Sequence, residues 1–519
     1  MLHKEQFLRT YKSMSDWHTF RLRLFAEGIL TGVCAGLVIC FFRFALEEVE
    51  GFRRALYNRL YVSDIFVNAC WFAVLLVVAF ILFKLTRKEP MAAGSGIPQV
   101  KGTLLGMMKM RWFSVLWVKL AAGILGIGAG LSLGREGPSI QLGAVSAQGV
   151  SRLLGRTRME ERYLLTSGAS AGLAAAFNAP LAGVIFALEE LHRNFSIMVL
   201  LPSMASAMTA TIISRAIFGR EAIFDIPRLE LLPINYYGIV VLVALAAGLA
   251  GVVFNKGLLN IPRFYALPVF RRPYVKIAFA VIAAGVLGYH LPEVLGGGNL
   301  LINQLAKEPA SLKLLVLFFF GKLIFTLVSY GCGVPGGFFL PMLVIGALSG
   351  SICANLLTVS GMIDPAYAAN IVVIAMAALF SSSVRAPITG TVLIMEMTSS
   401  YQQLLSLALA SMVAFVIAEL CRSKPIYEEL LSRMLNRSKP APALMEQRNV
   451  FEFSVASGSA ASGRLIKDVH WPPKTLIVEI KRGEEILVPS GDVLLMAGDF
   501  LYVMTDNEHL EELQKLMDA

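Results

Sequence analysis

Long apolar runs alternate with short polar and basic segments along most of this chain. Seven of these runs are Ile29–Phe42, Ile65–Leu85, Val115–Leu133, Ile239–Val253, Ile277–Leu287, Leu314–Val328 and Leu404–Leu420. A helix needs about 20 apolar residues to cross a bilayer directly, and several of the runs are shorter than that. Glycine and proline lie within or beside them, which is typical of tilted and half-crossing helices. The pattern therefore predicts an all-α polytopic membrane domain.

The composition agrees with a chain that lies in a lipid bilayer. Of its 519 residues, 56% are hydrophobic and 16% are charged, whereas about a quarter of the residues in a soluble domain are charged. The formal net charge is +10, and Lys and Arg gather beside the apolar runs at 4–23, 87–88, 152–162 and 422–437. The positive-inside rule accounts for this charge without nucleic acid as a partner. We expect an inner or plasma membrane protein with both termini in the cytoplasm.

The first 25 residues differ from the apolar runs that follow. They mix Trp, Phe and Leu with Lys and Arg, which predicts an amphipathic helix over residues 1–25 on the cytoplasmic membrane surface. The segment is too polar and basic for a cleavable signal peptide.

The most informative stretch is Gly134-Arg135-Glu136-Gly137-Pro138, which lies inside the apolar passage from Trp112 to Ala147. A charge at the centre of a membrane helix costs about 2.5–3.5 kcal/mol or more, so charged residues there are rare. Glycine permits unusual backbone angles, and proline fits the first turn of a helix. We therefore expect one helix to end and another to begin near mid-membrane. The free N–H groups of the new helix would attract an anion, and the Glu136 carboxylate would sit where that anion binds.

Two further breaks have the same character. They are Gly94-Ser95-Gly96-Ile97-Pro98 and the run from Gly331 to Pro341, which contains the sequence GVPGGFFLP at 333–341. Each lies between apolar runs and opens a new helix, so backbone N–H groups, and in the first case the Ser95 hydroxyl, are expected to point into a cavity. Four basic side chains also stand against apolar runs, where pairing within the helix bundle is a commoner fate than a role near the anion: Lys119, Arg135, Lys322 and Arg385.

An internal repeat relates the two halves of the membrane domain. Residues 178–189 and 385–396 share Ala, Pro, Gly and Glu at the same positions, offset by 207 residues. One of the glycine-rich breaks precedes each copy. This arrangement predicts an inverted repeat, with halves over roughly 26–220 and 230–437 whose half-helices converge on a site at the membrane midplane.

From Arg448 onward the composition is that of a small soluble domain. The pattern predicts strands at Val450–Ser457, Lys474–Ile480, Glu485–Pro489 and Phe500–Thr505, and helices at Gly463–Val469 and Asn507–Met517. A Pro- and Ala-rich linker precedes it at 438–447. The expected organisation is a membrane domain over 26–437 and a cytoplasmic α/β domain over 448–519.

Taken together, the three glycine-rich motifs closely resemble those of the CLC family of chloride channels and chloride/proton antiporters, over about residues 31–427. The resemblance implies a homodimer in which each subunit has its own anion pathway and two inverted halves. It also implies that Glu136 is the gating glutamate and proton carrier. The residues implied to bind chloride are Ser95, Gly137, Phe338, Phe339 and Tyr427.

The resemblance also bears on whether the protein exchanges or merely conducts chloride. Glu190 aligns with the family's internal proton-transfer glutamate, which channel members usually lack, so it favours chloride/proton antiport over a passive channel. The alternative for Glu190 is a structural acid at a helix end or at a dimer contact. A fluoride-exporting branch departs from the serine motif, whereas this chain keeps Ser95 and Tyr427, so chloride is the preferred ion.

The C-terminal domain resembles the C-terminal lobe of regulatory domains of potassium-transport systems, the RCK_C or TrkA-C type. The matching stretches are 485–492 and 497–502. The resemblance implies either a sensor of a small ligand or a dimerising module. The sequence contains no nucleotide-binding loop, metal-ligand cluster or nucleophile arrangement, so we expect neither an enzyme nor a metal or organic cofactor.

Overall fold

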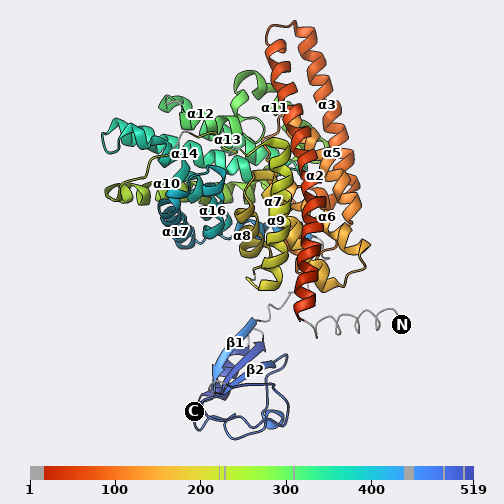
Figure 1. The fold of residues 1–519 in the computed structure, drawn as a ribbon, viewed down its shortest axis with the longest axis vertical. Coiled ribbons are helices and arrows are strands. Elements are labelled where there is room, and N and C mark those ends of the chain that lie inside the picture. Colours follow the sequence, from red (N-terminus) through yellow and green to blue (C-terminus); the bar gives the residue numbers. More distant parts are fainter. Residues whose placement is uncertain are drawn as a thin grey trace. The chain divides into compact units, whose positions relative to one another are not determined.

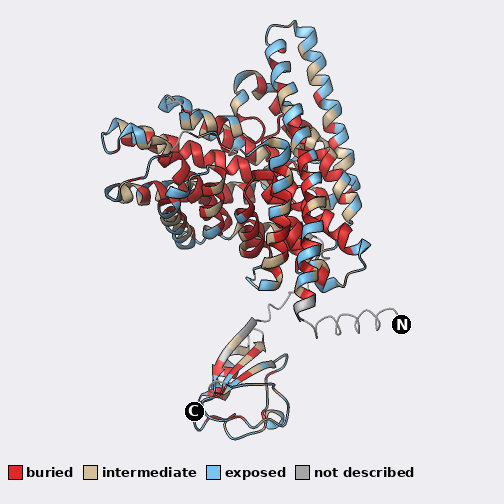
Figure 2. Ribbon diagram, viewed as in Figure 1, coloured by how far each residue is buried: buried red, intermediate tan, exposed pale blue. Residues whose placement is uncertain are grey.

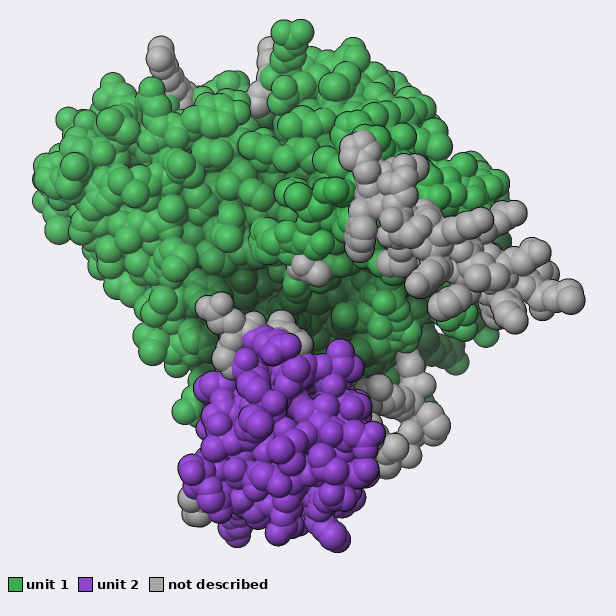
Figure 3. All heavy atoms as spheres, turned by 60° about the horizontal axis from the view of Figure 1, so that its bottom comes forward, with its two compact units in different colours: residues 1–436 green, residues 437–519 purple. Residues whose placement is uncertain are grey.

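The computed structural model describes residues 17–193, 195–220, 223–226, 229–307, 310–437, 449–482, 485–505 and 509–518. The chain forms two compact units, residues 1–436 and 437–519, which Figure 3 shows in different colours. Each unit is described by itself.

The regular elements of the first unit are all helical in its described residues (Figure 1). Among those residues, nine helices are long and apolar enough to cross a membrane. The predicted all-α fold is therefore confirmed. The helices are α2 (Trp17–Leu60), α3 (Ile65–Lys88), α4 (Ile97–Leu104), α5 (Trp112–Gly128), α6 (Glu136–Leu153), α7 (Arg158–Phe177), α8 (Pro180–Phe186), α9 (Ile197–Phe218), α10 (Tyr237–Phe264), α11 (Pro273–His290), α12 (Asn299–Lys307), α13 (Leu312–Gly331), α14 (Phe339–Val359), α15 (Ala368–Val384), α16 (Pro387–Met397), α17 (Leu404–Leu420) and α18 (Ile426–Arg437).

The apolar runs did not reveal every long helix. α9, α14 and α15 carry Ser, Thr, Asn or Gly among their apolar residues, which shortens the apolar runs. These side chains face other helices rather than lipid, and 83% of the most apolar window of α15 is buried. Packing inside the unit thus supplies the apolar surroundings that the sequence pattern lacks.

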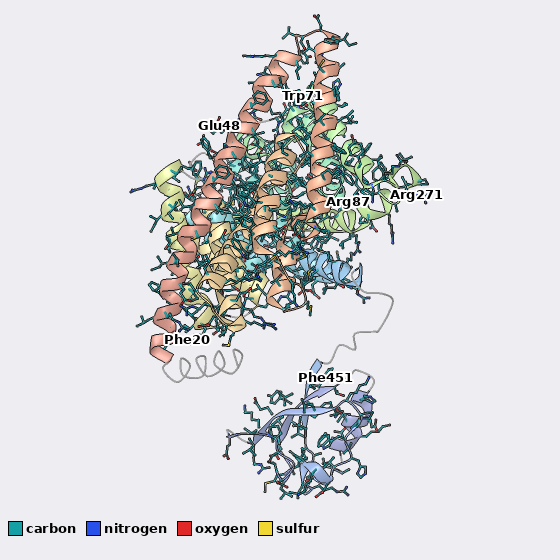
Figure 4. The ribbon with its side chains drawn as sticks, turned by 90° about the vertical axis from the view of Figure 1, so that its right-hand side faces the viewer. Phe20, Glu48, Trp71, Arg87, Arg271 and Phe451 are labelled. Carbon is teal, nitrogen blue, oxygen red and sulfur yellow. The ribbon has the colours of Figure 1, made fainter. Side chains whose placement is uncertain are left out.

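The N-terminal prediction also changes. Residues 17–25 are the start of the 44-residue helix α2, which continues without a break, and residues 1–16 lie outside the described part. Phe20 and Leu24 are buried, so this segment packs against the unit instead of forming a separate surface helix up to residue 25. In Figure 4, Phe20 lies toward one side of the unit, and Glu48 of α2 and Trp71 of α3 lie toward the other.

Close packing of small residues holds the long helices together. α2, α7 and α9 lie side by side in Figure 1, and α6 packs on α7. A Cβ atom at Gly143 of α6 would lie 2.1 Å from the carbonyl oxygen of Gly168 of α7. Such contacts allow two helix backbones to touch, as is common in membrane bundles. Figure 2 shows the resulting buried interior and the exposed residues around it.

The two halves are joined by reciprocal helix caps. The Glu189 carboxylate accepts a 2.7 Å hydrogen bond from the backbone N–H of Thr389, at the start of α16. The Glu396 carboxylate accepts a 2.8 Å bond from the backbone N–H of Ala182, at the start of α8. Each repeat copy therefore ends in an acid that satisfies the helix start of the other copy, as a carboxylate does well.

The second unit contains an antiparallel four-stranded sheet in the order β1-β4-β2-β3, with a short helix after the last strand. The predicted α/β class is confirmed, and several strands and the last helix begin or end at other residues than predicted. The core includes Phe453, Ile480 and Leu501 of the strands and Leu513 of the helix. The elements are β1 (Asn449–Ser454), β2 (Leu476–Arg482), β3 (Glu485–Leu487), β4 (Phe500–Thr505) and α19 (Leu510–Met517).

The helix predicted at Gly463–Val469 is wrong, because only a 3₁₀ turn at Ile466–Asp468 is present. The backbone N–H groups of Gly463 and Ile466 donate to the carbonyl oxygens of Leu495 and Val493. Pairing with this distant segment takes the N–H groups that a helix would have used.

Candidate functional site

The three glycine-rich breaks meet in one place. Gly134 and Gly337 exchange two backbone hydrogen bonds, with N···O distances of 2.6 and 2.9 Å. The N–H of Gly336 donates to the carbonyl oxygen of Gly94 at 2.9 Å. The breaks at 94–98, 134–138 and 333–341 are therefore one connected site, formed where α4, α6 and α14 begin.

Glycine is required at this junction because backbones approach closely. A Cβ atom at Gly137 would lie 2.9 Å from the carbonyl oxygen of Ser95. Gly96 has a φ of +91°, and a Cβ atom there would lie 2.4 Å from Oε1 of Gln141. Only a residue without a side chain fits such contacts and such a φ at low cost.

Glu136 is the first residue of α6 and is fully buried. Its carboxylate lies beside its own backbone N–H and that of Leu340 at the start of α14. Neither contact has full hydrogen-bond geometry, and both carboxylate oxygens lack a partner among the described residues. A buried charge without strong partners is costly, so this carboxylate is held loosely where two helix starts converge.

Two hydroxyl groups lie in the same interior. Ser95 is 1% exposed; its Oγ accepts a long bond of 3.4 Å from the N–H of Ile97, and the residue also contacts Tyr330. Tyr427 is fully buried, and its hydroxyl has no hydrogen-bond partner in the described part of the chain. Its ring stacks on Phe338, with centroids 5.3 Å apart. The Tyr427 hydroxyl is therefore a hydrogen-bond donor without a partner in the described residues, and an anion could accept from it.

The predicted residues Ser95, Glu136, Gly137, Phe338 and Tyr427 are thus brought together, and Phe339 joins them. Phe338 caps the N-terminus of α14 and Phe339 is its first residue; both are fully buried. Phe339 packs against Phe177 and Phe186, with centroids 5.6 and 6.2 Å apart. The aromatic surroundings exclude water from the helix start.

Two buried lysines each bind a glycine-containing backbone loop of the membrane unit. Lys119 of α5 donates to the carbonyl oxygens of Ala92 and Gly94 at 2.9 and 2.7 Å. Lys322 of α13 donates to those of Val294 and Gly296 at 2.9 and 2.8 Å. Both ammonium groups are fully buried. Each lysine therefore holds one backbone loop in place by two hydrogen bonds.

The two lysines extend the internal repeat beyond its sequence match. Each binds a loop in which two glycines have positive φ: +62° at Gly94 and +91° at Gly96, and +60° at Gly296 and +97° at Gly298. The second loop has Gly297 where the first has Ser95. Sequence analysis missed this loop because it contains no polar side chain.

The four basic residues that stand against apolar runs are thus paired in two different ways. Arg135 pairs with Glu47 at 3.2 Å, and Arg385 pairs with Glu419 at 2.7 Å. The expectation of pairing within the bundle is confirmed for both arginines. The two lysines bind backbone carbonyl oxygens, which are also common partners of basic groups inside a membrane bundle.

Glu190 lies on a single π-helical turn, Ala187–His192. Its side chain is 2% exposed and forms a 2.8 Å ion pair with Lys101 of α4. Glu189, its neighbour, instead caps α16. The two consecutive acids are therefore separated, and Glu190 is buried near enough to Tyr427 to interact with it electrostatically. The contact with Lys101 was missed, although Lys101 follows the Ser95 motif by less than two helix turns.

Two family models match this chain. The voltage-gated chloride channel model covers residues 74–419, and the TrkA-C domain model covers residues 450–518. The chain belongs to the CLC family of voltage-gated chloride channels. The resemblance drawn from the three motifs is thus confirmed, as is the resemblance of the C-terminal unit to the TrkA-C type. The protein is a multi-pass membrane protein of a family that is not enzymatic.

Relatives and solved structures of this family are similar over most of the chain. The H(+)/Cl(-) exchange transporter ClcA of Vibrio vulnificus is 37% identical over 436 residues, covering 81% of this chain and 92% of that protein. ClcA of Vibrio campbellii is 37% identical over 424 residues, covering 79% and 89%. A slow cyanobacterial Cl−/H+ antiporter has a TM-score of 0.75 and 32% identity, covering 80% of this chain and 99% of that one. A CLC-type fluoride/proton antiporter, with a TM-score of 0.65 and 24% identity over 78% of this chain and 97% of that one, shares the fold.

Proposed function

We propose that this protein exchanges chloride for protons across a membrane. The observation that carries the proposal is the Glu136 carboxylate, which is buried and lies beside the helix starts of α6 and α14. A chloride ion and this carboxylate compete for the same N–H groups, because both carry negative charge. Protonation removes the charge of Glu136 and releases the side chain. One residue thereby links the binding of a proton to the binding of chloride.

The chloride site consists of the Ser95 and Tyr427 hydroxyls and the backbone at Gly137, Phe338 and Phe339. The partnerless, fully buried Tyr427 hydroxyl supports this assignment, because a buried donor is costly unless something accepts from it.

Glu190 passes protons between Glu136 and the cytoplasmic side. Its burial and its position near Tyr427 support this role over that of a solvent-facing helix-end acid. The relatives from Vibrio are named H(+)/Cl(-) exchange transporters, and a structure at 32% identity is a Cl−/H+ antiporter. A passive chloride channel is the second candidate. It is favoured only if the ion pair with Lys101 is the sole role of Glu190, so that Glu190 transfers no protons.

The protein has both termini in the cytoplasm and works as a homodimer with one pathway in each subunit. Arg87 and Lys88 end α3, and Arg152 lies in the last turn of α6, which supports this orientation under the positive-inside rule. The family relationship supports the dimer. The TrkA-C unit either senses a small ligand or holds the two subunits together.

The deciding experiment measures proton movement in liposomes that contain the purified protein under an imposed chloride gradient, without a proton gradient. We expect uphill proton movement in the wild type, and its loss in Glu136→Gln and Glu190→Ala. Chloride flux without proton movement in the wild type would refute exchange and favour the passive channel. Proton pumping that persists in Glu136→Gln would refute the role of that residue.

A further inference from the structure

Glu190 belongs to a cluster of four charged side chains. Lys101 Nζ lies 2.8 Å from Oε1 of Glu190 and 3.5 Å from Oε1 of Glu428. Arg193 forms an ion pair with Glu428 as well. One ammonium group is therefore shared by two carboxylates, and the second carboxylate has its own arginine.

The cluster joins three elements, and two of them, α4 and α18, also carry or adjoin residues of the proposed chloride site. Lys101 lies on α4, the helix that the Ser95 motif opens. Glu428 lies in the first turn of α18, directly after Tyr427. Glu190 lies on the π-helical turn that packs on α4. The cluster is thus close in sequence to Ser95 and Tyr427, two residues of the proposed chloride site.

The two carboxylates differ in their access to water. The side chain of Glu190 is 2% exposed and that of Lys101 is 4% exposed, whereas that of Glu428 is 36% exposed. Glu189, the acid adjacent to Glu190, is used to cap α16. Glu190 therefore has little direct contact with water, and the acid that shares its counter-ion has considerable contact.

We propose that Glu428 passes protons between cytoplasmic water and Glu190, and that Lys101 is the positioning residue that holds both carboxylates. The proposal rests on the chloride/proton exchange proposed above. Lys101 and Glu428 extend the proton route beyond Glu190, from the interior to the surface.

The transfer balances without any other reactant. The Glu428 carboxyl O–H bond breaks, and its proton forms an O–H bond on the Glu190 carboxylate, directly or through one water molecule. Glu428 becomes the charged partner, so the Lys101 ammonium shifts its stronger contact from Glu190 to Glu428 and keeps all its protons. The net charge of the cluster stays constant, which avoids the large cost of an unpaired buried charge.

The other groups around the cluster fit this arrangement. Tyr427 of α18 also lies near enough to Glu190 to interact with it electrostatically. His192, on the same turn as Glu190, faces α7, where its Nδ1 lies 3.1 Å from Oγ1 of Thr166 and where Arg162 and Tyr163 lie beside it. The route from Glu428 to Glu190 therefore passes Lys101 rather than the imidazole.

The test compares Glu428→Gln with Glu428→Asp in the full-length protein in liposomes, by the ratio of proton to chloride flux under a chloride gradient. Glu429→Gln is the matched control, because Glu429 is the next acid on α18 but pairs with Lys424 and Arg433. A positioned proton donor contributes about 10²–10⁴-fold to a transfer, and water can replace part of it, so we expect Glu428→Gln to lower the ratio at least about tenfold. Aspartate should restore most of the ratio, and the control should keep it.

Lys101→Met and Lys101→Arg provide a second, independent readout. We expect methionine to displace the pH profile of proton flux, because Glu190 loses its counter-ion, and arginine to restore the profile. An unchanged ratio in Glu428→Gln, or an equal loss in Glu428→Gln and Glu428→Asp, would overturn the proposal. If these results accompany uphill proton movement in the wild type, the proposed exchange still stands; if the wild type moves no protons, both proposals fail.

Discussion

Gly134→Ala places a methyl group against the buried carboxylate of Glu136. A Cβ atom at this position would lie 2.3 Å from Oε2 of Glu136, and 3.1 Å from Cβ of Leu340 and Cδ of Pro341. Favourable separations begin at about 3.5 Å, so the carboxylate oxygen must move by about 1 Å. The neighbours on α14 need to move by only a few tenths of an ångström. The end of the glutamate side chain is the freest of these groups, so it is the one displaced.

This displacement weakens the competitor of chloride. The carboxylate lies beside two backbone N–H groups without full hydrogen-bond geometry, so each contact is taken at about 1.5 kcal/mol, the lower limit for a hydrogen bond to a charged group. Loss of roughly one such contact corresponds to a fall of about tenfold in the apparent Kd for chloride. Isothermal titration calorimetry of the purified variant with chloride measures this change directly.

Two comparisons isolate the mechanism. Gly238→Ala on α10 is the control, because a Cβ atom there has nothing within 4 Å, and we expect wild-type affinity. In a Glu136→Gln background the competitor carries no charge, so Gly134→Ala should add little. An unchanged Kd in Gly134→Ala would refute the competition, and so would an equal gain in the Gln background.

Three further predictions concern the site and the C-terminal unit. Glu136→Gln should keep chloride flux and abolish proton coupling, as measured in liposomes. Ser95→Pro should raise nitrate preference over chloride, which competition between the two anions for uptake measures; unchanged selectivity would place the determinant elsewhere. Burial acts to raise the pKa of Asp499, but hydrogen bonds from Arg482 and from the Met496 N–H outweigh it, so the pKa lies below its ordinary value. The pair therefore stabilises this unit above about pH 4 and is lost as the pH falls further. Arg482→Met should speed hydrogen exchange of β2 and β4 in the full-length protein at pH 7, and its difference from the wild type should shrink as the pH falls below about 4.

The sequence predicted the helix breaks well because their causes are local. Glycine and proline inside an apolar run stop one helix and start another whatever lies nearby. The starts of α6 at Glu136 and of α14 at Phe339 follow directly from this. The inverted repeat predicted that the breaks at 134–138 and 333–341 converge, because it relates segments that are far apart in sequence.

What the sequence did not predict depends on distant partners. Lys119 and Lys322 bind carbonyl oxygens of loops that lie 25 to 28 residues away. Every residue has a backbone carbonyl, so the sequence does not show which ones accept these bonds. The segment at Gly463–Val469 is not a helix because it pairs with residues 491–495. The ion pair between Lys101 and Glu190 joins residues 89 positions apart. In each case a tertiary contact overrides or completes the local preference.

The two halves share one backbone plan and differ where the proposed chemistry lies. α6 begins with an acid, Glu136, and α14 begins with an aromatic residue, Phe339. One lysine-bound loop carries Ser95, and its counterpart carries Gly297. Two carboxylates at the same junction would repel each other and hold a shared proton tightly, which would obstruct both chloride and proton release. Under the proposed exchange, the repeat accounts for two helix starts that attract one anion, and the difference between Glu136 and Phe339 accounts for one carboxylate that carries one proton.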